Sequence, residues 1–256
     1  MMRICRGLFV AVFAFATSFN YASSNNIDTC KVAKADSAAY KFSILKLVAP
    51  VGMIGAGVMG LTSDWVEGRN RDVNEKIQEN IRRRNRIDNV VQYLPSAALY
   101  GLRLCGVKGR HDYKENTLLL GTSCAIMALT VNVLKHTVRE QRPDGSSYNS
   151  FPSGHTATAF MGAELLWQEY KDVSPWIGVG GYMVATGVGV MRMSNNRHWA
   201  TDVIAGAGIG ILSVKAAYWL YPSLHKLIFG KKRLDNVSVA PFYMKKSIGI
   251  SAYVAF

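Results

Sequence analysis

His198 and Asp202 lie four residues apart, just before and within the start of a long apolar segment. Residues four apart share one face of a helix, so the carboxylate can reach one imidazole nitrogen. A carboxylate in that position fixes the tautomer of a histidine and stabilises the cation formed when the ring attacks an electrophile. The spacing therefore indicates a histidine that a carboxylate orients and whose cationic form it supports. A buried structural hydrogen bond between the two side chains would need the same spacing.

A second cluster, Pro152-Ser153-Gly154-His155, opens another apolar segment. Proline suits a first helical turn, so we expect a helix to begin here. Ser153 and Gly154 would then present free backbone N–H groups at the positive end of the helix, where anions bind. Gly154 would let a phosphate come close to the backbone. His155 would stand beside that anion and could protonate a leaving oxygen, although a histidine at a helix start can also be purely structural.

Three cationic side chains stand at the ends of apolar segments, namely Lys135, Arg142 and Arg192. Pro143 biases Arg142 away from helical geometry, so the chain is expected to turn there. The planar fork of Arg192 matches two oxygens of a phosphate group. Cations gathered at one place repel each other unless an anion lies between them. For Lys135 and Arg142, the alternative is a basic helix end whose long side chains reach from the apolar helix to water.

Together, the three clusters resemble the signature of the phosphatidic acid phosphatase type 2 (PAP2) superfamily. That signature reads Lys-x6-Arg-Pro, then Pro-Ser-Gly-His, then Ser-Arg-x5-His-x3-Asp. Residues 135–143 match the first motif, and residues 152–155 match the second. Residues 191–202 match the third in spacing, with Met191 where the family usually has serine. The departure puts one hydrogen bond to phosphate in doubt.

The resemblance implies a phosphatase that needs no metal and no cofactor. It implies that His198 attacks phosphorus, that Asp202 orients it, and that His155 protonates the leaving alcohol. Fixed cations and backbone amides would hold the phosphate oxygens and neutralise developing charge. The residues expected to bind the substrate are Lys135, Arg142, Ser153, Gly154 and Arg192.

Composition places these clusters in a helical membrane protein. Of 256 residues, 49% are hydrophobic and 18% are charged. The mean hydropathy of +0.08 is low for a chain made only of membrane spans. The resemblance implies a membrane-embedded helical bundle of the PAP2 type, and the apolar segments give about five or six helices, so the expected fold class is all-α. Gly206 and Gly210 are four apart, a spacing that lets helices approach closely. The apolar segments are 42–62, 116–134, 152–170, 176–190 and 200–220, and 92–106 is either a span or an in-plane helix.

The expected organisation has five parts. Residues 1–22 have the charge and apolar pattern of an export signal, with an uncleaved anchor as the alternative. A linker follows at 23–40, then an N-terminal helical region at 41–115, a catalytic core at 116–222 and a tail at 223–256. Alternation of apolar residues with period two near the end of the tail predicts a β-hairpin.

The expected partners are a bilayer and a phosphorylated lipid. The net charge of +13 favours anionic partners, and nucleic-acid-binding motifs do not accompany it. Because each cluster adjoins an apolar segment, the site should lie at the membrane–water boundary. The candidate substrates are lipid A, undecaprenyl pyrophosphate, phosphatidylglycerol phosphate and phosphatidic acid, and the export signal favours an envelope lipid such as lipid A.

The expected location is the inner membrane of a bacterial-type envelope, with the site facing the periplasm. If the signal is cleaved, this orientation requires that one of the three apolar segments before Lys135, such as 92–106, does not cross. Two alternatives to a membrane lipid phosphatase remain at this point. One is a soluble secreted acid phosphatase of the same superfamily, and the other is a non-catalytic membrane protein that binds anionic lipid.

Overall fold

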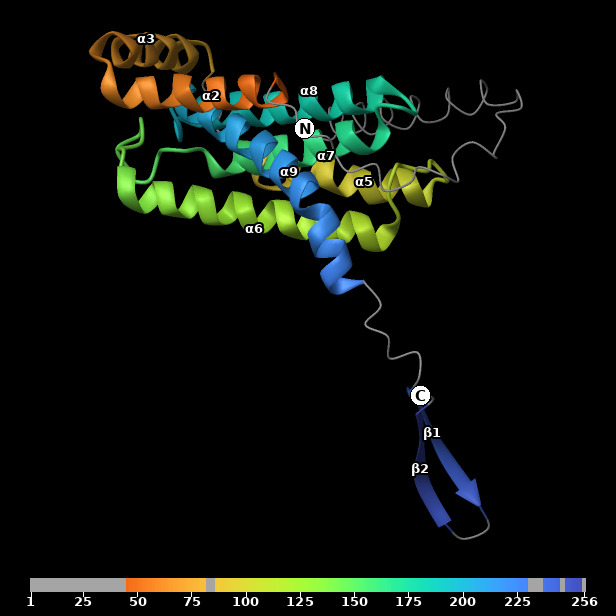
Figure 1. Cartoon of the computed structure of the whole chain (residues 1–256). Coiled ribbons are helices and arrows are strands. Elements are labelled where there is room, and N and C mark those ends of the chain that lie inside the picture. Colours follow the sequence, from red (N-terminus) through yellow and green to blue (C-terminus); the bar gives the residue numbers. More distant parts are fainter. Residues whose placement is uncertain (1–44, 82–85, 230–236, 245–246, 255–256) are drawn as a thin grey trace, which may run out of the picture. The chain divides into compact units, whose positions relative to one another are not determined.

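The structure is a computed structural model that describes residues 45–81, 86–229, 237–244 and 247–254. The predicted signal at 1–22 and linker at 23–40 lie outside the described residues. Figure 1 shows the helices and strands along the chain. The described elements are α2 (Leu45–Thr62), α3 (Asp64–Asn80), α4 (Asp88–Val91), α5 (Leu94–Leu104), α6 (Tyr113–Val138), α7 (Gly154–Tyr170), α8 (Pro175–Ser194), α9 (Ala200–Ile228), β1 (Val237–Met244) and β2 (Ser247–Val254).

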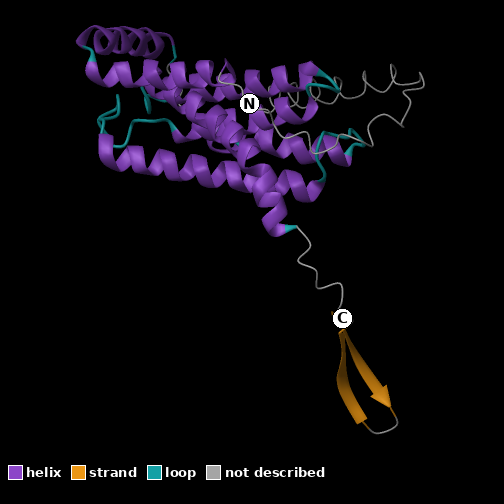
Figure 2. Ribbon diagram, in the orientation of Figure 1, coloured by secondary structure: helices purple, strands orange, loops and turns teal. Residues whose placement is uncertain are grey.

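The predicted combination of a helical bundle with a C-terminal hairpin is confirmed (Figure 2). β1 and β2 pair antiparallel, with Val237 opposite Val254 and Met244 opposite Ser247. The alternating pattern that predicted these strands is the one a pleated backbone produces, since successive side chains point to opposite faces.

Three of the described helices, α2, α6 and α9, are long and apolar enough to cross a membrane. At 1.5 Å per residue, the 26 residues of α6 span about 39 Å, more than the ~30 Å of a bilayer core. Large apolar side chains on these helices point outward, for example Leu45 at 82% exposed, Leu129 at 69% and Val133 at 52%. Such surfaces are unfavourable in water and favourable in lipid, so the bundle is suited to a membrane.

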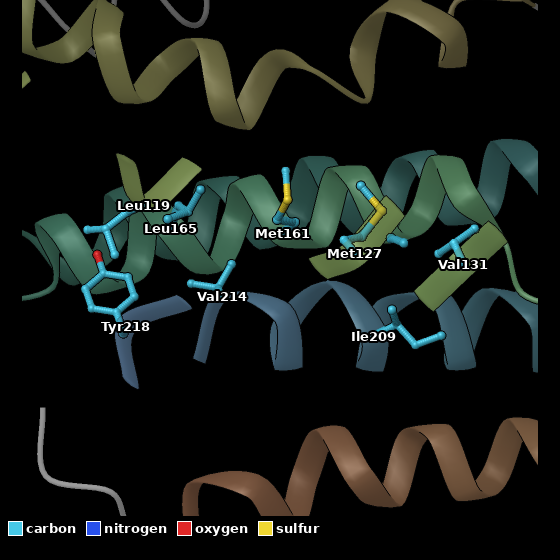
Figure 3. Packing of buried hydrophobic residues seen from close by; sticks show 9 residues of the cluster. Leu119, Met127, Val131, Met161, Leu165, Ile209, Val214 and Tyr218 are labelled. Carbon is cyan, nitrogen blue, oxygen red and sulfur yellow. The ribbon is translucent and has the colours of Figure 1, made fainter. Parts of the chain in front are cut away.

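The core of the bundle lies where α6, α7 and α9 pack together (Figure 3). Glycines on α9 set the approach of α9 to α7: a methyl group on Gly206 would overlap the carbonyl oxygen of Ser153, and one on Gly210 would overlap that of Ala157. The prediction that these two glycines serve close packing is therefore confirmed. The buried apolar side chains of this core are Leu119, Met127, Val131, Ala157, Met161, Leu165, Ile209, Val214 and Tyr218.

The segment 92–106, for which a span and an in-plane helix were both open, contains α5, which has only 11 residues. The chain nevertheless runs from one end of the bundle to the other in this region. Asp88 accepts a hydrogen bond from Arg192 at the end of α8, whereas His111 forms a hydrogen bond with Glu169 at the end of α7. Because α7 and α8 are antiparallel neighbours, these two contacts lie at opposite ends of the bundle. The chain therefore traverses the bundle between 88 and 111, as α4 and α5 with a break between them.

The direction of α2 follows from its contact with α9. A methyl group on Gly60 would overlap the side chain of Thr201, so α2 ends where α9 begins. Both α2 and α6 thus end at the same end of the bundle, and α4 and α5 bring the chain back between them. A cleaved signal together with a periplasmic site requires that one of the three segments before Lys135, such as 92–106, does not cross. In the structure, 92–106 runs along the bundle rather than across it.

Candidate active site

Four helix ends meet at the site. α6 and α8 end there, and α7 and α9 begin there, so the loops between them converge. Every side chain that the sequence analysis assigned to catalysis or phosphate binding lies on one of these ends or loops. The antiparallel order of the helices thus brings together residues that span 135–202 in the sequence.

His198 precedes α9, and Asp202 lies in the first turn of that helix. Nδ1 of His198 lies 3.6 Å from Oδ2 of Asp202, an ion-pair distance rather than a hydrogen-bond length. The side chains are 2% and 0% exposed. The carboxylate therefore faces Nδ1, which leaves Nε2 as the nitrogen that can act on a substrate.

The carboxylate of Asp202 is held by two further donors. Oδ2 accepts hydrogen bonds from the backbone N–H of Trp199 at 2.9 Å and from the hydroxyl of Ser150 at 2.5 Å. Bonds from neutral donors to a carboxylate favour its ionised form and fix its position. Asp202 is therefore oriented before any substrate arrives.

The start of α7 differs from expectation in one respect. The backbone N–H of Ser153 was predicted to be free for an anion, but it donates to the carbonyl oxygen of Asp202 at 3.1 Å. The cause is the close approach of α9 to α7, which pairs this amide across the interface. The side-chain hydroxyl of Ser153 is also engaged, 2.8 Å from that of Thr156. Gly154 begins the helix, where backbone amides have no helical partner.

Arg192 is buried near the end of α8. Its Nη1 donates to Oδ2 of Asp88 at 2.6 Å, and the amide of Asn195 donates to the same oxygen at 3.2 Å. Nε of Arg192 is buried and has no hydrogen-bond partner in the described part of the chain. A buried donor without a partner is costly, so this edge of the guanidinium is suited to a ligand that accepts hydrogen bonds.

His155 lies in the first turn of α7 and faces α4. Its Nε2 is 2.8 Å from Oδ1 of Asn89. Arg192, His198 and Arg142 are all close enough to influence its charge electrostatically. His155 thus lies close to His198 and to two of the cations.

Lys135 and Arg142 complete the group of cations. Nζ of Lys135 donates to the carbonyl oxygen of Asn149 at 2.6 Å. Nε of Arg142, like that of Arg192, is buried without a partner among the described residues. Burial, followed by repulsion from Arg192 and the nearby Arg197, lowers the pKa of Arg142. Positive charges pressed together in this way indicate a place for an anion.

The electrostatic surroundings of His198 suit a nucleophile. Burial is the largest cause that lowers its pKa, and Arg192 and Lys135 lower it further, whereas Asp202 opposes them. The outcome is a pKa of about 4. The ring is therefore neutral at physiological pH, and only a neutral imidazole has a lone pair for attack.

Glu140 was missed by the sequence analysis, which treated it as a spacer between Lys135 and Arg142. Its carboxyl lies against that of Asp202, and burial together with this neighbour raises the pKa of Glu140 to about 9. Of two adjacent carboxyls, one stays protonated. Ser150, Asp88 and Asn89 were missed as well, and no spacing rule points to them.

A cavity of about 640 Å³ opens beside the site. Arg142 and Glu140 line one side, and residues of α2 and α3 line the other. Polar groups provide most of its surface, so it is suited to a hydrated ligand rather than an acyl chain. Its lining residues are Gly60, Leu61, Glu67, Asn70, Arg71, Val138, Glu140, Gln141, Arg142, Pro143, Gly145 and Trp199.

Comparison with known proteins gives one family. The sequence model of the PAP2 superfamily matches residues 116–226. We refer to this matched segment as the PAP2 domain. All eight predicted site residues lie within this domain, whereas α2, α3 and α4, which add Asp88, Asn89 and part of the cavity, lie before it.

Two curated proteins are similar in sequence to part of the chain. A lipid A 1-phosphatase of Porphyromonas gingivalis is 46% identical over 136 residues, which are 53% of this chain and 31% of the relative. The bacitracin transport permease protein BcrC of Bacillus licheniformis is 36% identical over 76 residues, which are 30% of this chain and 36% of the relative. The chain thus spans about a third of the length of each of these relatives.

Two solved structures are similar to the chain. One is a transmembrane PAP2 type phosphatidylglycerolphosphate phosphatase from Bacillus subtilis, with a TM-score of 0.49 and 21% identity over 73% of this chain and 99% of the other. The other is Aquifex aeolicus LpxE, with a TM-score of 0.45 and 24% identity over 57% of this chain and 92% of the other.

Proposed function

We propose that the protein is a membrane phosphatase that hydrolyses a phosphomonoester or pyrophosphate on a lipid through a phosphohistidine intermediate. One observation carries this proposal. A buried His198–Asp202 pair faces the cations Arg142 and Arg192, and each of these cations has a buried Nε without a partner among the described residues. An anion with several acceptor oxygens would satisfy both guanidinium groups next to a nucleophile.

In the first step, Nε2 of His198 attacks phosphorus, a P–N bond forms, and the bond to the leaving oxygen breaks. The imidazole becomes cationic as it attacks, and the carboxylate beside Nδ1 stabilises that charge. Asp202 is already oriented by Ser150 and Trp199, so little reorganisation is needed during attack.

His155 protonates the leaving oxygen, so that an alcohol rather than an alkoxide departs. A water molecule then attacks phosphorus, gives up a proton to His155, and releases inorganic phosphate as the P–N bond breaks. The histidine that acts as acid in the first step acts as base in the second, and both residues return to their starting states.

Lys135, Arg142 and Arg192 would hold the non-bridging oxygens during both steps. Phosphoryl transfer spreads charge over these oxygens, so positioned cations stabilise the transition state without performing covalent chemistry. The backbone N–H of Gly154 would add a donor from the start of α7. The N–H of Ser153 is paired with Asp202 and is left out of this assignment.

Lipid A is the substrate we propose first. The support is the 46% identical relative whose name is lipid A 1-phosphatase. The polar cavity beside Arg142 is large enough to receive a head group while acyl chains remain in the bilayer around the bundle. Undecaprenyl pyrophosphate, phosphatidylglycerol phosphate and phosphatidic acid are the comparison substrates.

We propose an inner-membrane location with the site facing the periplasm. α2 ends at the site end of the bundle, so this orientation places its start, Leu45, on the cytoplasmic side. A cleaved export signal at 1–22 would put the start of α2 in the periplasm instead. In this proposal, a periplasmic site and a cleaved signal are therefore alternatives.

The test of function is phosphate release by the purified full-length protein in detergent micelles. The panel consists of lipid A, undecaprenyl pyrophosphate, phosphatidylglycerol phosphate and phosphatidic acid, each with and without a metal chelator. Release should be fastest from lipid A and insensitive to the chelator. His198→Ala and His155→Ala should each abolish release while leaving the protein folded.

Three results would count against the proposal. Full activity of His198→Ala would exclude the nucleophile, and loss of activity with the chelator would contradict a metal-independent reaction. Binding of anionic lipid without any phosphate release would favour the non-catalytic alternative.

A further inference from the structure

α4 brings two neighbouring side chains into direct contact with the proposed active site. Asp88 accepts a hydrogen bond from Arg192, and Asn89 contacts His155. α4 lies before the PAP2 domain, so the catalytic motifs themselves do not include it. We propose that Asp88 and Asn89 are positioning residues for the cation and the proton donor of the site, an inference that rests on the proposed function.

Asp88 fixes the guanidinium of Arg192 from one side. The two side chains are 1% and 9% exposed, so each charge depends on the other for compensation. Asn195 donates to the same carboxylate oxygen at 3.2 Å and thereby holds Asp88 in place. The contact uses Nη1 of Arg192 and leaves the buried Nε without a partner in the described part of the chain. Asp88 therefore orients the guanidinium so that its Nε edge is available to a phosphate.

Asn89 fixes the ring of His155. Its Oδ1 lies 2.8 Å from Nε2, and a carbonyl oxygen can only accept, so Nε2 carries the hydrogen. An amide orients the ring without adding a charge. A carboxylate at the same position would stabilise the imidazolium and hold its proton more tightly. Because Nε2–H is donated to Asn89, the proton that His155 gives to a leaving oxygen would come from Nδ1, and a neutral asparagine does not hold that proton more tightly.

Both contacts come from one helical segment of four residues. A rigid segment that holds the cation with one residue and the acid with the next sets the separation between them. In phosphoryl transfer that separation matters, because the phosphate oxygens and the leaving oxygen must be met at the same time. The placement of α4 thus completes the site from outside the catalytic motifs.

The test for Asp88 uses the full-length protein in micelles with short-chain phosphatidic acid as the probe. Asp88→Asn should lower kcat about 10- to 100-fold per folded molecule, because a misplaced contact to the transition state costs that much, with little change in KM. Asp88→Glu, which keeps the carboxylate, should restore part of the loss. Asp72→Asn, which removes the exposed partner of Arg69, is the matched control and should leave kcat unchanged. An unchanged kcat in folded Asp88→Asn would overturn the role of Asp88.

The test for Asn89 is the pH profile of kcat. In Asn89→Asp, the new carboxylate beside His155 favours the imidazolium, so the alkaline limb should move up by about one pH unit or more. Asn80→Asp, at an exposed position on α3, should not move it. A role confined to folding would change the yield of protein but not this limb, so an unmoved limb would overturn the role of Asn89.

Different results would overturn the positioning role and the proposed function. Active wild-type protein with unaltered Asp88 and Asn89 variants would overturn the positioning role alone. Absence of phosphate release from every lipid by the wild-type protein would overturn the proposed function and the positioning role with it.

Discussion

At the scale of single residues, the site combines His198, the proposed nucleophile, with several groups that keep its ring neutral and oriented. His198 owes its low pKa of about 4 mainly to burial, and Asp202 owes its orientation to Ser150 and Trp199. Glu140 adds a second carboxyl at this point, and because it is held protonated it does not add a second negative charge. The site therefore carries positive charge around a neutral imidazole, which suits an anionic substrate.

Glu140→Gln tests the protonation of this carboxyl. The pKa of Glu140 is raised from 4.5 to about 9 in the folded protein. Its contribution to stability is thus complete below about pH 4.5 and is lost as the pH rises towards about 9. Glutamine cannot ionise, so thermal unfolding in detergent should show the variant gaining stability over the wild type as the pH rises through this range. Glu79→Gln on the exposed face of α3 should show no such trend, and a constant difference for Glu140→Gln would contradict the assignment.

Some residues of the site could be predicted from the sequence and others could not, and the difference has a physical reason. The positions from Lys135 to Asp202 could be predicted because each lies at a fixed spacing within a short motif at a helix end. Asp88 could not, because its contact with Arg192 joins residues 104 positions apart and depends on the path of α4. The pairing of the Ser153 amide with Asp202 could not be predicted either, since it arises from the distance between α7 and α9.

At the scale of elements, close packing of α9 on α7 sets the geometry of the site. Ser153 and Asp202 meet because Gly206 lets the two backbones approach, and Gly210 continues the contact one turn further along α9. The glycine spacing was visible in the sequence, but its partner helix was not. For α5, hydropathy alone left a span and an in-plane helix open, and only the contacts on either side of α5 show that the chain runs along the bundle there.

Gly210→Ala tests this packing. The new methyl group would overlap the backbone of Ala157, so the two helices must move apart. The expected loss is about 1–3 kcal/mol in the free energy of unfolding, seen as a lower Tm in detergent. Gly187→Ala on α8 is the matched control, because no atom lies within 4 Å of its added methyl group. Gly187→Ala should be neutral or should stabilise by up to ~1 kcal/mol through helix propensity. Equal Tm values for the two variants would contradict the packing role.

At the scale of the whole molecule, the site lies at one end of a bundle whose outward surface is apolar. Lys114 lies in the first turn of α6, and Ser146 lies in the loop after the other end of α6, where the site is. The orientation of the bundle in the membrane therefore determines both the side that the site faces and the side on which each helix end lies. Charge and hydropathy do not determine this orientation, because basic residues occur at both ends of the bundle.

Cysteine labelling tests the orientation of the bundle in the membrane. Ser146→Cys and Lys114→Cys, each in a cysteine-free background, place one thiol at each end of α6. On the proposed orientation, a membrane-impermeant maleimide should label position 146 in intact spheroplasts and label position 114 only after permeabilisation. The reverse pattern would place the site in the cytoplasm and would agree with a cleaved export signal.

The central claim is that His198 becomes phosphorylated during turnover. The most direct measurement is a rapid alkaline quench of the full-length protein turning over a lipid phosphate, followed by mass spectrometry of its peptides. The account predicts a phosphoryl group on the imidazole of His198 and none on that peptide in His198→Ala. A phosphoryl group on any other side chain during turnover would contradict it.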